Sequence, residues 1–353
     1  MKFGIFSLPT YFPDVDGTVH DFYERLITLF TESEDLGFDS CWVNEHHYHA
    51  FGGMIPSPPV FLAAIARQTE RVRLGTSVSL LPLHPPIELA EQYAMLDQIS
   101  GGRLEFGFGR GFIKRDFEVL GVPWDAGQEQ MLEALSVITK SWTEPTLTYH
   151  GKFYDYEGIA VWPRPLQQPH PPLWGAGTRA PESFRYYGRQ GYNLMTTAYV
   201  SSIENVAKLV DEYWAGAEEA GHDLSTLECS IQFQVYCHPD SAQGRSVGQA
   251  AARRYTELLN EARAEGNTPL VPLDSFPWDT LAEKGRICAG SPDDCVRIIE
   301  NAQKLLGLTQ VHGTFYFGGI PYPEAEASLR LFAKEVIPRL RDSKAPRRNT
   351  VAR

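Results

Sequence analysis

Residues 72–108 decide the fold, and they read VRLGTSVSLLPLHPPIELAEQYAMLDQISGGRLEFGF. The segment opens with a largely apolar run, residues 72–81, that is typical of a buried strand. Residues 86–99 have helical spacing, with proline in the first turn, where a missing N–H does no harm. A pair of glycines then turns the chain into a second strand, residues 103–108. A strand, a helix and a strand in this order indicate parallel strands joined by a helical crossover.

The same alternation continues on both sides of this segment. Upstream, strands are expected at residues 2–8 and 39–43, and helices at 22–36 and 60–69. Downstream, strands are expected at 173–176, 192–196, 227–237 and 310–317, and helices at 128–142, 203–220, 293–306 and 324–340. About eight such units favour an α/β fold of the (β/α)8 TIM-barrel type, with insertions, over an open doubly wound sheet.

The domain organisation follows from where the alternation stops. Residues 1–340 are predicted to form a single barrel domain. Residues 147–154 resemble a small hairpin, and residues 241–285 form a long insertion with one clear helix at 249–264. The tail, residues 341–353, is basic and polar, and we expect it to be disordered.

Composition limits the possible partners. The 353 residues carry a net charge of −12 and have no basic tract before the tail. Nucleic acid and anionic membranes are therefore not expected partners. No apolar run approaches transmembrane length, and the chain begins with a strand rather than with the apolar run of a signal peptide. The five cysteines form no Cys-x-x-Cys pair, which fits reduced thiols in the cytoplasm.

A histidine-rich loop follows the apolar run at residues 40–43. It contains Glu45, His46, His47 and His49. Strand ends carry the chemistry of α/β folds, and histidine exchanges protons near neutral pH. Three interpretations of this loop remain open. It could be a metal site, a proton-handling site beside a cofactor, or a loop with a hydrogen-bonded structural histidine. No helically spaced histidine or cysteine partner is obvious, so we expect no metal.

Two glycine-containing segments have the character of anion sites. Residues 107–111 follow a strand, and their backbone N–H groups could approach an anion beside the forked donor of Arg110. The alternative is a tight turn with a surface arginine. Residues 175–183 lead from a strand into a helix, and Thr178 or Ser183 could cap it. A helix N-terminus with hydroxyl groups is suited to phosphate, although an ordinary capped helix has the same pattern.

Together, these segments make the chain resemble the bacterial luciferase-like family of flavin-dependent monooxygenases, and in particular the alkanal-monooxygenase subunits. The matching stretches are residues 1–6, 45–48, 51–52, 74–82, 96–103, 106–111 and 116–117. Their order and spacing carry the resemblance, which is dense up to about residue 122. The resemblance implies a (β/α)8 barrel, usually dimeric, that takes reduced flavin from a separate reductase.

The resemblance also implies roles for particular residues. His46 corresponds to the family's essential histidine, which acts on proton transfers around the flavin hydroperoxide. Arg110 corresponds to the arginine that holds the FMN phosphate, and Ser77–Val78 lies where the family has a non-prolyl cis peptide under the flavin ring. The implied cofactor-binding residues are Ser77, Val78, Gly109, Arg110, Gly177, Thr178 and Ser183. Phe6, Leu8 and Phe112 are expected to line the substrate site and to shield it from water.

The sequence departs from the luciferases at three places. Gly109 stands where luciferases can have a reactive cysteine. Gln128 stands where they have a second arginine for the phosphate, which implies a looser hold on flavin. The long luciferase lid is not recognisable in residues 241–285, so the resemblance implies flavin chemistry without implying light emission.

The resulting hypothesis is a two-component flavin-dependent monooxygenase. Reduced FMN and O2 would give a C4a-hydroperoxyflavin that oxygenates a small organic substrate by hydroxylation, Baeyer–Villiger insertion or epoxidation. The expected partners are a flavin reductase, a small-molecule substrate and a second copy of the chain in a homodimer. Two alternatives stay open, which are deazaflavin-dependent hydride transfer and a flavin-binding subunit without catalytic activity.

Overall fold

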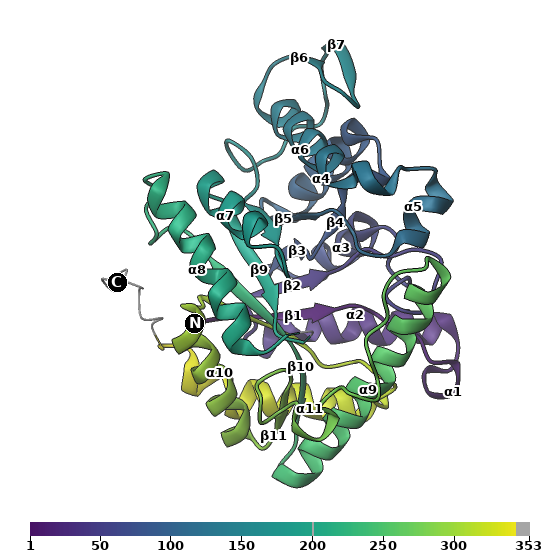
Figure 1. Cartoon of the computed structure of the whole chain (residues 1–353), viewed down its shortest axis with the longest axis vertical. Coiled ribbons are helices and arrows are strands. Elements are labelled where there is room, and N and C mark those ends of the chain that lie inside the picture. Colours follow the sequence, from purple (N-terminus) through teal and green to yellow (C-terminus); the bar gives the residue numbers. More distant parts are fainter. Residues whose placement is uncertain (200, 344–353) are drawn as a thin grey trace.

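The computed structural model describes residues 1–199 and 201–343, in which parallel strands close into a barrel (Figure 1). The barrel consists of β1 (Lys2–Ser7), β2 (Ser40–Val43), β3 (Arg73–Thr76), β5 (Leu104–Gly109), β8 (Leu173–Ala176), β9 (Asn193–Thr197), β10 (Cys229–Cys237) and β12 (Gln310–Thr314). Closure is complete because β10 pairs with both β9 and β12, and β12 pairs with β1. The predicted (β/α)8 barrel is confirmed.

Helices surround the barrel and connect consecutive strands (Figure 1). The covering helices are α2 (Val19–Asp35), α3 (Pro58–Ala66), α4 (Pro86–Ser100), α6 (Gly127–Thr143), α7 (Pro181–Gln190), α8 (Ile203–Glu219), α10 (Pro292–Leu306) and α11 (Tyr322–Glu335). Of the shorter helices, α1 (Pro13–Asp16) precedes α2, α5 (Lys114–Leu120) lies between β5 and α6, and α12 (Ile337–Leu340) follows α11. The long helix α9 (Ser241–Glu265) follows β10. Within the described residues, no helix is both long and apolar enough to cross a membrane.

The barrel interior is filled by aromatic rings. The ring of Trp42 lies edge-on to that of Trp174, with 5.1 Å between centroids, and stacks on His312 at 4.5 Å. Glycine is required at Gly75 on the neighbouring strand, because a Cβ atom there would lie 2.1 Å from Cε3 of Trp42. Burial lowers the pKa of His312 to about 3, so this histidine is neutral at neutral pH.

The strand predicted at residues 72–81 is wrong in one respect. The chain forms β3 and then breaks at a cis peptide between Ser77 and Val78, which confirms the position expected for that bond. It resumes as the short strand β4 (Ser79–Leu80), which pairs with β5, and continues as the 3-10 helix η1 (Leu81–Leu83). The apolar pattern did not reveal the break because most side chains on both sides of it are buried.

The second half of the chain contains the other differences. The predicted hairpin is present as β6 (Leu147–His150) and β7 (Asp155–Ile159), although its second strand begins after residue 154. The helix predicted at 249–264 begins earlier, because Asp240 caps α9 by accepting a hydrogen bond from the backbone N–H of Gln243. Strand β11 (Cys288–Gly290) pairs with β10.

The predicted tail begins in an ordered position. Arg341 donates to Asp39 from its Nη1 atom at 2.5 Å, which ties the last helical residues to the start of β2. The rest of the predicted tail, residues 344–353, lies outside the described residues.

Candidate active site

A cavity of about 300 Å³ opens at the carboxyl ends of the barrel strands. Nearly all the predicted site residues line it, although they come from five different strand ends. They are Phe6, Leu8, His46, Ser77, Val78, Gly109, Arg110, Phe112 and Thr178. Two predicted residues, Gly177 and Ser183, do not line it. Gly177 faces Phe184, whose ring would meet a Cβ atom at 2.6 Å, and Ser183 lies in the first turn of α7.

His46 is buried against this cavity beside a carboxylate that the sequence did not assign. Its Nδ1 atom lies 3.8 Å from Oδ2 of Asp116, and Nε2 of His49 lies 3.6 Å from Oδ1 of the same residue. The ring of Phe112 stands edge-on to the His46 ring, with 5.1 Å between centroids. The Nδ1 atom of His46 and the Oδ1 atom of Asp116 have no hydrogen-bond partner among the described residues. Of these residues, His46 and Phe112 line the cavity, whereas His49 and Asp116 lie behind His46, so the His46 ring is the titratable group that a bound molecule would contact.

Burial sets the protonation state of this group. It lowers the pKa of His46, and the neighbouring Asp116 carboxylate opposes that effect without overcoming it. Burial alone would raise the pKa of Asp116, but the two histidines lower it below its usual value. At neutral pH the arrangement is thus a neutral imidazole beside an ionised carboxylate, which suits a proton acceptor.

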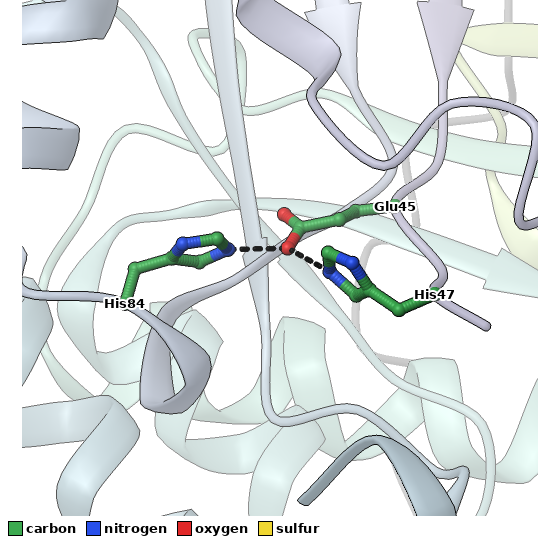
Figure 2. A group of neighbouring side chains, drawn as sticks. All are labelled: Glu45, His47 and His84. Atoms are coloured by element: carbon green, nitrogen blue, oxygen red, sulfur yellow. Dashed lines mark hydrogen bonds and ion pairs between the residues drawn. The ribbon is translucent and has the colours of Figure 1, made fainter. Parts of the chain in front are cut away.

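Glu45 forms a separate network on the other side of the loop. Figure 2 shows the rings of His47 and His84 reaching the same carboxylate oxygen, with His47 Nε2 at 3.0 Å. The other oxygen accepts hydrogen bonds from the backbone N–H of Leu80 at 3.0 Å and from Ser79 Oγ at 3.2 Å. Glu45 thereby ties the loop after β2 to the segment after the cis peptide.

The pKa of Glu45 reflects these contacts. Burial acts to raise it, but the hydrogen bonds from His47 and His84 outweigh burial and lower it to about 2. The charge of Glu45 in turn raises the pKa of His84 against the effect of burial. Of the three interpretations of the histidine loop, a hydrogen-bonded structural histidine therefore describes His47 best.

The structure also gives the histidines partners that sequence spacing did not show. Glu45, His47 and His84 offer three ligand atoms within 4.8 Å of one another, and so do His46, His49 and Asp116. Hydrogen bonds already account for the first group. The expectation of no metal rested on missing partners, so that reasoning was incomplete and the absence of a metal stays a prediction.

The remaining cavity wall fits a flavin ring. The Cβ atom of any larger residue at Gly109 would lie 2.5 Å from Cγ2 of Val78, so glycine allows these two segments to approach. Asn44 and Thr196 also line the cavity, and their buried side-chain polar atoms lack partners among the described residues. Unpaired buried polar groups are costly, and the carbonyl and N–H groups of an isoalloxazine ring would satisfy them.

The residues expected to bind the FMN phosphate differ in detail from the sequence-based expectation. Neither Thr178 nor Ser183 caps α7, whose N-cap residue is Ala180 and makes no side-chain cap; that expectation was wrong. Pro181 at the start of α7 has no N–H, and the N–H of Ser183 donates to the carbonyl of Ala180 at 3.0 Å. Of these first residues, only Glu182 has an N–H group that could bind an anion. Arg110 makes no ion pair among the described residues; it donates to the carbonyl of Trp124 and lies over that ring, 3.9 Å from its centroid.

Several site residues escaped the sequence reasoning. Asp116 belonged to a matching stretch but received no role, and it lies on α5, a helix that was not among the expected elements. Asn44 and Thr196 lie at strand ends, and that position is the signal that could have identified them. Nothing in the local sequence around His84 indicated its contact with Glu45.

The fold is a (β/α)8 barrel, and the cavity at the carboxyl ends of its strands has a lining that fits a flavin-like cofactor. Residues 1–307 match the family described as luciferase-like monooxygenase, and the chain belongs to that family of flavin-dependent oxygenases. It is 29% identical over 350 residues to the oxygenase component of flavin-dependent trigonelline monooxygenase from Acinetobacter baylyi, covering 94% of each chain.

Two further comparisons cover almost the whole chain. It is 26% identical to the alkanal monooxygenase alpha chain of the Kryptophanaron alfredi symbiont, covering 97% of this chain and 99% of that one. The crystal structure of the monooxygenase RslO1 from Streptomyces bottropensis superposes with a TM-score of 0.87 at 29% identity, covering 96% and 99% of the two chains.

Proposed function

We propose that the protein is the oxygenase component of a two-component monooxygenase, which receives reduced FMN from a separate flavin reductase and oxygenates a small organic substrate with O2. The observation that carries the proposal is the convergence of Asn44, His46 and Thr196, all with unpaired buried polar atoms, on the cavity beside Ser77–Val78. The named oxygenase component from A. baylyi supports the two-component arrangement.

Each part of the cavity has a task in this proposal. Reduced FMN, when bound, supplies the electrons that activate oxygen. Arg110 and the uncapped start of α7 would hold the phosphate, with Thr178 beside them. The neutral Nδ1 or Nε2 atom of His46 would accept and return a proton at the reacting edge, and Asp116 would stabilise the charged ring.

Water must be kept from the reacting atoms. Phe6 and Leu8 are almost fully buried and Phe112 is 40% exposed, and all three line the cavity. Together they form an apolar wall beside His46, which would favour oxygen transfer over release of hydrogen peroxide. The substrate would approach along this wall.

Two further parts of the proposal concern the surroundings of the protein. Helices α3 and α4 pack against each other and expose Val60, Met95 and Ile99, with exposed fractions of 72%, 49% and 37%. Exposed apolar side chains on neighbouring helices support a homodimer through this face. All five cysteines are buried and unpaired, which supports a cytoplasmic location.

Anaerobic titration with the two candidate cofactors tests the function. The protein should bind reduced FMN, and Arg110→Gln should weaken binding by roughly tenfold because a charge-assisted pair to the phosphate is lost. Arg115→Gln, an exposed neighbour on α5, is the matched control. Preferential binding of a reduced deazaflavin would instead indicate hydride transfer.

A further inference from the structure

A second cavity, of about 240 Å³, adjoins the flavin cavity on the side of α9. The two cavities share Leu8, Phe112, Thr178, Thr197 and Gln232, so they meet along these residues. This adjacency is what a substrate site beside a cofactor requires.

Aromatic rings form much of the wall of the second cavity. Phe51 lies 4.9 Å from Tyr255, and Tyr255 lies 5.9 Å from Tyr199, measured between ring centroids. The hydroxyl of Tyr199 is already used, since it donates to the carbonyl of Ala252 at 2.7 Å. These side chains therefore present mainly ring surface, which suits a planar, apolar occupant.

Two arginines line the same cavity without a counter-ion. Within residues 1–199 and 201–343, neither Arg179 nor Arg263 forms an ion pair with a carboxylate. Arg263 Nη1 donates to the carbonyl of Pro269 at 2.8 Å, while its Nε atom is buried and lacks a partner. Burial and the nearby charge of Arg179 both lower the pKa of Arg263. A bound anion would relieve this repulsion and supply the missing acceptor.

One more polar atom points to a ligand in this cavity. The Oε1 atom of Gln234, which is 4% exposed, has no hydrogen-bond partner among the described residues. It would accept a hydrogen bond from an O–H or N–H group on a ring that lies against the tyrosines. The cavity thus offers an aromatic slot, a cationic pair and one acceptor.

We propose that this second cavity binds the substrate, and that the substrate is an aromatic carboxylic acid whose carboxylate pairs with Arg179 and Arg263. The inference rests on the proposed function, because it names the substrate class of that reaction. Gln234 would select rings that carry a hydroxyl or N–H group. The shared boundary at Phe112 would bring the ring to the edge of the flavin cavity beside His46.

The FMN phosphate is also an anion, so it is the alternative partner for the arginine pair to a substrate carboxylate. The two arginines line the second cavity and not the first, whereas Arg110 lines the first and not the second. Arg263 also comes from α9, and its Cζ atom lies 5.6 Å from the centroid of Phe112, which lines both cavities. This division assigns Arg110 to the cofactor and the arginine pair to the substrate.

Binding of matched probes tests the inference without any turnover. The probes are 2-naphthoate and its neutral amide, 2-naphthamide, each titrated calorimetrically into the wild-type protein and into Arg179→Gln and Arg263→Gln. The naphthoate should bind at least about tenfold more tightly than the amide, and each substitution should weaken only naphthoate binding, by about tenfold or more. Arg253→Gln, an exposed position on the same helix that pairs with Glu257, should change neither probe.

The possible failures are distinguishable. Equal binding of the two probes, or unchanged naphthoate binding in both variants, would overturn the inference. Weaker binding of FMN with unchanged binding of naphthoate would assign the pair to the cofactor phosphate and also overturn it. Failure of reduced FMN to bind, with the naphthoate preference intact, would overturn the proposed function and leave the anion site standing. A thermal melt of each variant shows whether it folds, and Arg179→Gln changes an exposed side chain.

Discussion

The Nδ1 atom of His46 lies 3.8 Å from Oδ2 of Asp116, which joins the loop after β2 to the helix after β5. The carboxylate lies between two imidazoles, since His49 approaches its other oxygen to 3.6 Å. Such a carboxylate fixes the orientation of a neighbouring ring and stabilises its charged form. We therefore predict that Asp116 is a positioning residue for His46.

Substituting Asp116→Asn should lower the pKa of His46 further. The carboxylate raises that pKa against the larger effect of burial, so its removal leaves only the charge of Glu45 to oppose burial. Because the neutral imidazole is the proton acceptor, the acidic limb of the pH–rate profile should move to lower pH. The maximal rate should also fall, because an imidazole with a lower pKa is a weaker base. An NMR titration of the His46 ring measures the shift directly, and Asp125→Asn is the control. An unchanged His46 titration would contradict the positioning role.

Glu45 should be a main determinant of stability toward acid. Its folded pKa of about 2 lies below its ordinary value of 4.5, so its stabilisation is complete above pH 4.5 and is lost as the pH falls toward 2. The difference corresponds to about 3 kcal/mol. Glu45→Ala should cost about 3–5 kcal/mol at pH 7, because it also leaves His47 and His84 without their acceptor.

Urea unfolding at pH 7 and at pH 3 measures the contribution of Glu45. The wild-type protein should lose stability between the two pH values, and the variant should lose distinctly less. Glu118→Ala, on the exposed side of α5, controls for loss of a surface carboxylate. Equal acid sensitivity of wild type and variant would show that Glu45 is not the group responsible.

Gly109→Cys should weaken FMN binding by about tenfold or more, because the new Cβ atom would lie 2.5 Å from Cγ2 of Val78 and push that side chain into the flavin cavity. Val78→Ala in the same chain removes the clash and should restore most of the affinity. Quenching of FMN fluorescence measures both. If the double variant binds FMN no better than Gly109→Cys alone, crowding at Val78 is not the cause.

Met95→Glu should convert the proposed homodimer to a monomer, because it places a charge within the proposed apolar face of α3 and α4. Light scattering after size-exclusion chromatography reports the mass. Leu270→Glu introduces a charge at another exposed apolar position, 54% exposed, and should leave the mass unchanged. A wild-type protein of 39.6 kDa in solution would contradict the dimer itself.

The barrel was predictable because its signal is local and repeated. Each strand is a short apolar run and each helix shows its own spacing, so errors at single boundaries do not change the count of units. The interruption at Ser77–Val78 was different. Burial continues on both sides of it, and only the family resemblance indicated the cis bond that divides β3 from β4.

The site was predictable where residues follow strands and was missed where contacts span the chain. His46, Arg110 and Thr178 each lie at a strand end, so position alone brings them together. His84 meets Glu45 across 39 residues, and Arg263 reaches the cavity from α9, in the insertion, where the resemblance is thin. Such contacts depend on how helices pack over the barrel, which sequence periodicity does not encode.

The most direct test of the account is the reaction of bound reduced FMN with oxygen. The protein is loaded anaerobically with reduced FMN and mixed rapidly with oxygenated buffer, and the return of oxidised-flavin absorbance is followed with the yield of hydrogen peroxide. Wild-type protein should delay the return of oxidised-flavin absorbance relative to free flavin. The His46→Ala variant should bind reduced FMN equally well, but its delay should be shorter by at least about tenfold. Failure of the wild-type protein to bind reduced FMN, or identical time courses for wild type and His46→Ala, would contradict the account.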